Sequence, residues 1–156
     1  MDYSITDKFT LVPQQMDSPE FLKKLFGTCT NENIAHVAIE QYGAVLYFMK
    51  DNTESLPLIC FLLKKTGEIK EHNKIAVSFC KEKQIVFITA AEGEKLRLAN
   101  SYKAADFTTA LYFIMLATQQ MMFNPLLTEL HFYNAMEPQD IELVNRYFKD
   151  CKLHNL

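Results

Sequence analysis

The residue types that most often do chemistry in proteins, histidine and cysteine, are widely spaced in this chain. The histidines are His36, His72, His131 and His154. The cysteines are Cys29, Cys60, Cys80 and Cys151. No two of them have the HxH, HExxH or CxxC spacing of a metal site. The sequence therefore predicts no metal site and no cofactor, and it favours free, structural cysteines in a reducing compartment.

His131 is the most informative of these residues, because it lies in a short apolar run two positions before Tyr133. Neither a nucleophile nor an orienting partner for it can be named from the sequence. A structural histidine is therefore favoured over a ligand or a catalytic base. The serines also lack the glycine context of a nucleophile elbow, so the chain is not predicted to be an enzyme.

The elements that would position these side chains are clearest in the second half of the chain. Alternating apolar residues predict strands at 74–80, 84–90 and 94–101, a helix at 104–121, a strand at 128–133 and a helix at 138–151. Two tight turns make the first three strands antiparallel neighbours. The helical crossover lets the fourth strand lie parallel beside the first. This β-β-β-α-β-α order predicts an α/β fold with a mixed, α+β type of sheet.

The first half of the chain predicts a smaller set of elements. An extended run at 9–12 is followed by a short helix that starts near Asp17 and ends at Gly27. Strands at 34–40 and 44–50 form a hairpin around Gly43, and a helix at 52–65 stops at Gly67. The polar stretch 66–73 is the one internal boundary. We expect residues 1–70 to form a reduced N-terminal lobe, and 71–156 a C-terminal lobe, within one compact unit.

Two short motifs carry a family resemblance. One is Phe9-Thr10-Leu11-Val12-Pro13, and the other is Leu98-Ala99-Asn100-Ser101-Tyr102 followed by Ala105-Asp106-Phe107 and Leu111-Tyr112-Phe113-Ile114. With the order of elements, they resemble a family of uncharacterised Bacteroidetes proteins with an actin-like ATPase fold. The resemblance implies a ribonuclease H-like C-terminal lobe. Members of that family have a fuller first lobe than this chain.

The resemblance also indicates where a nucleotide would bind. Actin-like ATPases hold phosphate on a glycine-containing turn between the first two strands of each lobe. The corresponding turn, Cys80-Lys81-Glu82-Lys83, has no glycine, and Glu82 would repel phosphate. The segment after the parallel strand, Asn134-Ala135-Met136, also lacks the expected glycine. The acids Asp106 and Glu129 have no acidic partner on 74–80, so two-metal nuclease chemistry is not predicted.

The amino-acid composition limits the classes of binding partner that we expect. The net charge of −3 gives no electrostatic reason to expect nucleic acid. No apolar run reaches the length of a membrane span, and the N-terminus does not resemble a signal peptide. We therefore expect a cytoplasmic protein that binds neither nucleic acid nor membrane.

The favoured function is that of a non-catalytic structural or protein-interaction protein that binds a protein partner or a second copy of itself. The apolar cluster of Met115, Met121, Met122 and Phe123 could be core or a docking surface. A divergent ATP-binding protein and a small-molecule binding module stay open as alternatives. The candidate groove for them is formed by Cys80, Glu82, His131, Tyr133 and Asn134.

Overall fold

The computed structural model describes residues 3–16, 34–50 and 55–155, and their contacts form two compact units, Asp2–Cys60 and Phe61–Leu156. The division falls ten residues before the boundary expected after residue 70. The reason lies in the helix α2, Leu58–Glu68. Its Thr66 hydroxyl hydrogen-bonds to the hydroxyl of Thr89, and both side chains are buried. The part of this helix from Phe61 onward thus packs on the C-terminal sheet and belongs to the C-terminal unit.

The N-terminal unit is a three-stranded antiparallel sheet of β1 (Phe9–Pro13), β2 (Ile34–Ile39) and β3 (Ala44–Met49), in the order β1-β3-β2. Short 3-10 helices lie at Gln14–Met16 and Glu40–Tyr42. The expected hairpin is confirmed, and Gly43 closes it with a φ of 59° that favours glycine. The central strand β3 is buried along most of its length, as its two apolar faces predict.

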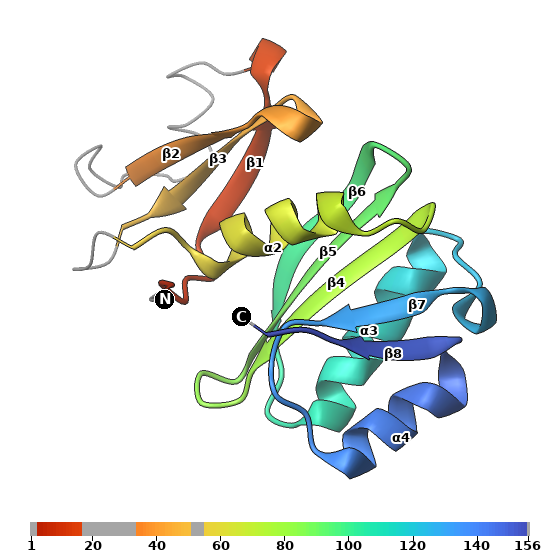
Figure 1. The fold of residues 1–156 in the computed structure, drawn as a ribbon. Coiled ribbons are helices and arrows are strands. Elements are labelled where there is room, and N and C mark those ends of the chain that lie inside the picture. The colour runs from red at the N-terminus through yellow and green to blue at the C-terminus, as the bar shows by residue number, and fades with distance from the viewer. Residues whose placement is uncertain (1–2, 17–33, 51–54, 156) are drawn as a thin grey trace. The chain divides into compact units, whose positions relative to one another are not determined.

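The C-terminal unit has a five-stranded mixed sheet (Figure 1). Its strands are β4 (Asn73–Cys80), β5 (Ile85–Glu92), β6 (Lys95–Lys103), β7 (Glu129–Phe132) and β8 (Asp150–Leu153). They lie in the order β6-β5-β4-β7-β8. The pairs β4–β5 and β5–β6 are antiparallel, whereas β7 lies parallel to both β4 and β8. The expected meander and its parallel neighbour are confirmed.

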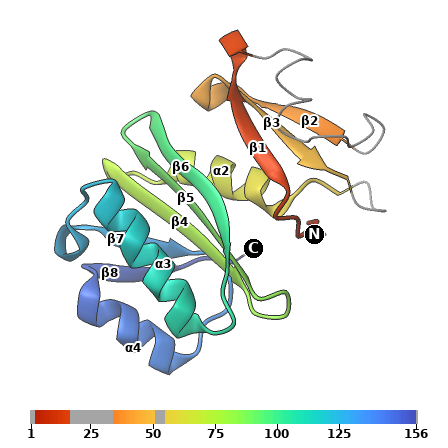
Figure 2. The ribbon, with the colours of Figure 1, turned by 180° about the vertical axis from the view of Figure 1, so that it is seen from behind.

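The main core lies between this sheet and two helices, α3 (Phe107–Gln120) and α4 (Pro138–Tyr147). Alternate strand residues, such as Val77, Ile88 and Phe132, face Ile114 of α3 and Val144 of α4. Figure 2 shows α3 against one face of the sheet, and α2 is seen behind the other face. Residues that alternate with the core positions, such as Thr89 and His131, therefore lie on the face away from α3.

Two helix predictions are wrong at their ends. The helix expected at 52–65 begins at Leu58, directly after Pro57, and continues through Gly67 to Glu68. The helix expected to reach residue 151 ends at Tyr147, because Phe148 is extended and Asp150–Leu153 pairs with β7 as the strand β8. This pairing provides hydrogen bonds for the backbone groups on the otherwise free edge of β7. A local sequence pattern cannot predict this stabilisation, because it depends on a distant strand. The helix expected between Asp17 and Gly27 lies outside the described residues.

Candidate functional site

A groove of about 530 Å³ lies where the C-terminal ends of β4 and β7 meet the N-terminal ends of α3 and α4. The side chain of Asn134 joins the two strand ends, because its Oδ1 accepts a hydrogen bond of 2.9 Å from the backbone N–H of Phe79. Lys81, at the start of the β4–β5 turn, also lines the groove. The groove is therefore at the place where the actin-like resemblance would put a phosphate.

Carboxylates dominate the charge of this groove. Asp106, Glu137 and Asp140 line it together with Lys81, whose Nζ lies 3.6 Å from Glu137 Oε1. Asp106 caps α3 by accepting a hydrogen bond of 2.8 Å from the N–H of Thr109, and this bond holds the pKa of Asp106 below its usual value. Burial, followed by the nearby Glu137, raises the pKa of Asp140. A phosphate group would meet repulsion here, whereas a neutral or cationic ligand would not.

The β4–β5 turn holds its shape without glycine. Gln84 has a φ of 55°, in the left-handed region, and its N–H donates to the carbonyl of Lys81 at 3.3 Å. Glu82 is exposed on this turn. Its carboxylate adds to the negative charge around the strand ends.

The five candidate residues are divided between two places. Cys80, Glu82 and Asn134 lie at the strand ends, and of the three Asn134 lines the groove. His131 and Tyr133 instead line a second pocket, of about 460 Å³, on the face away from α3. The cause is strand alternation: Leu130 and Phe132 point into the core, so the residues beside them point the other way.

A stack of three rings lines the second pocket. The rings of His131 and His154 are nearly parallel with centroids 5.1 Å apart, and Tyr133 stacks on His154 at 4.6 Å. His131 Nδ1 lies 2.9 Å from His154 Nε2, so one of these two atoms donates a hydrogen bond to the other. Burial lowers the pKa of both histidines and raises the pKa of Tyr133 to about 12. At neutral pH all three rings are therefore uncharged.

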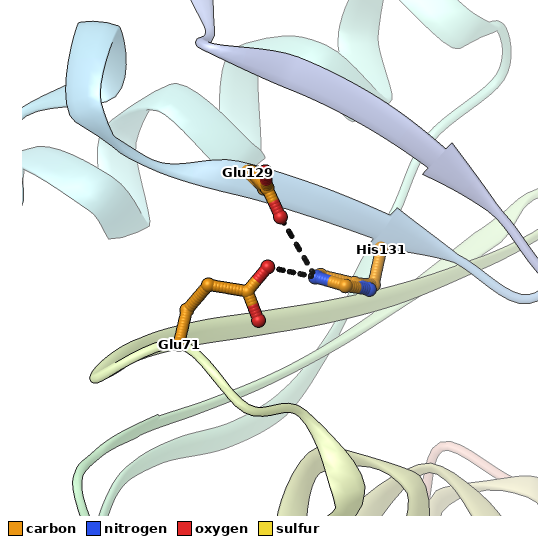
Figure 3. A group of neighbouring side chains, drawn as sticks. All are labelled: Glu71, Glu129 and His131. Atoms are coloured by element: carbon orange, nitrogen blue, oxygen red, sulfur yellow. Dashed lines mark ion pairs between the residues drawn. The ribbon is translucent and has the colours of Figure 1, made fainter.

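The other nitrogen of His131 points at two carboxyl groups (Figure 3). His131 Nε2 lies 3.5 Å from Glu71 Oε1 and 3.8 Å from Glu129 Oε2. These distances exceed those of good hydrogen bonds, and the buried Nε2 has no hydrogen-bond partner. The hydrogen bond between the carboxyl groups of Glu71 and Glu129 lowers the pKa of Glu71 and raises the pKa of Glu129. Both carboxyl groups are thus close to His131 Nε2 and to each other.

This cluster could not be assembled from the sequence. Glu71 precedes β4, and the parallel register Ile75↔Leu130 brings it near Glu129. His154 lies next to His131 because β8, which was not predicted, pairs with β7 and ends beside Phe132. The available signal was the spacing of Glu129 and His131, which puts both on one face of a strand. Glu71, the acid that partners Glu129, lies just before the strand expected at 74–80.

A third feature is an exposed apolar surface after α3, here called the turn surface and formed by Met122, Leu126 and Leu127. These side chains are 90%, 68% and 73% exposed. Met122 has a φ of 61°. The N–H groups of Met122 and Phe123 donate to the carbonyls of Gln119 and Thr118, the bonding pattern of a Schellman helix end, in which glycine is usual. Of the apolar cluster expected here, Met121 and Phe123 are core, and Met122 is surface.

No helix in the described ranges 3–16, 34–50 and 55–155 is both long and apolar enough to cross a membrane.

Comparison with known proteins gives both a family and a fold. A family model described as "Protein of unknown function (DUF3822)" matches residues 4–151. No curated protein matches. A crystal structure from Bacteroides thetaiotaomicron, of a protein with an actin-like ATPase fold and unknown function, is similar with a TM-score of 0.73 at 19% identity. The match covers 96% of this chain and 66% of that one.

The resemblance noted in the sequence is thus confirmed, and the chain has the mixed α/β architecture of the actin-like ATPase fold. The chain spans about two thirds of the length of that neighbour. It belongs to the DUF3822 family of proteins of unknown function.

Proposed function

We propose that the chain is a non-catalytic interaction protein that self-associates, with a second copy docking through the turn surface. The observation that carries this proposal is Met122, a large apolar side chain that is 90% exposed on left-handed backbone. Holding a residue other than glycine in this conformation costs about 1 kcal/mol. A contact that Met122 makes outside its own chain would offset that cost.

The charge pattern favours a second copy as the occupant. The sequence from Phe107 to Thr128 contains no charged residue, although the chain as a whole has a net charge of −3. Two copies that meet at the turn surface would therefore bring no like charges from this segment together, and a nearby charged residue is Lys149, whose backbone N–H donates to the carbonyl of Pro125. A two-fold axis would also bury both sets of apolar side chains against each other.

The edges of the C-terminal sheet are less suited to self-association. On β6 the Oδ1 of Asn100 accepts a hydrogen bond from the N–H of Ser101. On β8 the Oδ1 of Asp150 accepts one from the N–H of Cys151. Side chains that occupy backbone donors on both edge strands disfavour strand addition there.

The groove at the strand ends supports a non-catalytic role. A nucleotide phosphate placed beside Lys81 would face Asp106, Glu137 and Asp140. Free cysteines at 80 and 151 fit the cytoplasm as the site of action. The negative net charge fits a protein partner better than nucleic acid.

The test is the mass of the full chain in solution, measured by light scattering and sedimentation over a range of concentrations. We expect a dimer for the unmodified chain and a monomer for Leu126→Gln/Leu127→Gln. Leu56→Gln changes another large apolar side chain, 50% exposed and far from the turn surface in sequence, and serves as the control that stays dimeric.

Two glycine variants separate stability from association. Met122→Gly and Gln84→Gly each relieve a left-handed residue, so both should stabilise the fold by up to about 1 kcal/mol. Only Met122→Gly should weaken the dimer, because Gln84 lies on another turn. A monomeric unmodified chain, or equal dimerisation of both variants, would overturn the proposal.

A nucleotide measurement tests the non-catalytic part separately. We expect millimolar Mg-ATP to leave the melting temperature unchanged. Ligand at 100 times its Kd would add about 2.7 kcal/mol, which raises the melting temperature by several degrees. A rise of that size would favour the divergent ATP-binding alternative.

A further inference from the structure

We propose that Glu71, Glu129 and His131 together bind one divalent transition-metal ion. The site lies on the α2 face of the C-terminal sheet, among residues that neither the groove nor the turn surface uses. It stands independently of the proposed self-association.

The spacing of the ligand atoms suits one ion. One nitrogen and two carboxylate oxygens lie within 4.8 Å of one another, with His131 Nε2 3.5 Å from Glu71 Oε1 and 3.8 Å from Glu129 Oε2. Ligand atoms at about 2.1 Å from a tetrahedral ion are separated by about 3.4 Å. The two separations from His131 Nε2 therefore exceed this value by only a few tenths of an ångström.

The buried, unpaired Nε2 of His131 distinguishes this site from an ordinary cluster of acidic residues. The side chain of His131 is 9% exposed, and its Nε2 has no hydrogen-bond partner although it points at two carboxyl groups. A buried polar atom left in this state is unfavourable. A cation between the imidazole and the carboxylates would satisfy all three groups.

The second nitrogen of His131 is already held as in known metal sites. Its Nδ1 lies 2.9 Å from His154 Nε2, and Tyr133 stacks on the other ring. When Nδ1–H donates to His154, the lone pair of Nε2 is left facing Glu71 and Glu129. Metal-binding histidines are usually oriented by this kind of hydrogen bond from the nitrogen that does not bind the metal.

The donor set indicates the class of ion. One imidazole and two carboxylates suit Zn²⁺ or Mn²⁺ better than Mg²⁺, which prefers oxygen ligands alone. Two of the three ligands, Glu71 and His131, line the pocket of about 460 Å³. A water molecule or a small ligand could complete the coordination there.

The test uses the full chain, freed of metal by a chelator, and titrates it in parallel with Zn²⁺, Mn²⁺ and Mg²⁺. Calorimetry, metal analysis and thermal denaturation are the readouts. We expect one equivalent of Zn²⁺ or Mn²⁺ to bind and to raise the melting temperature by several degrees when present at 100 times its Kd. Glu71→Gln and Glu129→Gln should each weaken binding at least tenfold.

Both variants preserve side-chain shape and remove one of two facing carboxyl groups, so the metal-free proteins should still fold. His72→Asn is the matched control, because His72 and Glu92 form an exposed pair 3.8 Å apart and should not contribute. The Mn²⁺ titration guards against zinc captured by thiols such as Cys80. The proposal is overturned if neither ion binds, or if the two glutamine variants bind as tightly as the unmodified chain.

Discussion

Asp106 shows how a single carboxylate can serve the fold rather than a ligand. It caps α3 through the N–H of Thr109, at 2.8 Å, and this bond lowers its pKa. Asp106→Ala should lower the melting temperature by a few degrees at pH 7, and Asp106→Asn by less, because asparagine also caps helices. The carboxylate contributes fully above its unfolded pKa, near 3.8, and this contribution is lost as the pH falls through the lower folded value. Thermal denaturation should therefore show the gap between the unmodified chain and Asp106→Asn closing below pH 3.8; a gap independent of pH would contradict this role.

The strand β8 depends on Phe148, which lies two residues before it. Phe148 is 2% exposed and packs in the main core, whereas its neighbour Tyr147 is 48% exposed. Removing the buried ring leaves a cavity and releases the link between α4 and β8. Phe148→Ala should therefore cost about 3–5 kcal/mol of unfolding free energy, and Tyr147→Ala less than about 1 kcal/mol. Denaturant unfolding measures both, and hydrogen exchange should quicken along Asp150–Leu153 only in the first variant. Similar losses in the two variants would mean that Phe148 does not anchor the strand.

For the whole molecule, the chemistry of the turn surface predicts how association responds to salt. No charged residue occurs between Phe107 and Thr128. Apolar contact is only weakly screened by ions, so the Kd of the proposed dimer should change by less than about twofold between about 0.05 and 0.5 M NaCl. Sedimentation at the two salt concentrations measures this directly. A Kd that rises steeply with salt would instead indicate ion pairs, for example between Asp150 and Lys152 of facing copies.

Much of the fold could be predicted because its elements obey local rules. Alternating apolar residues along β4 and β5 show which face is buried, and Gly43 marks the hairpin turn. The crossover through α3 requires β7 to run parallel to β4. The candidate site was harder to predict from the sequence, because Glu71, Glu129 and His154 come from three separate segments. No local pattern links residues that are brought together by strand register.

The element order of the C-terminal unit and its mixed sheet follow from the sequence alone, because hydrophobic periodicity and turn residues act over a few positions. The resemblance to actin-like proteins also came from the sequence, through two short motifs. That Asp150–Leu153 is a strand is visible only in the folded chain, because it depends on an open edge of β7. The same is true of the neighbours of two candidate residues: His131 faces two carboxyl groups, whereas Asn134 lines a different groove. Those neighbours are set by sheet register and by the face on which each side chain emerges, and both are properties of paired strands rather than of one segment.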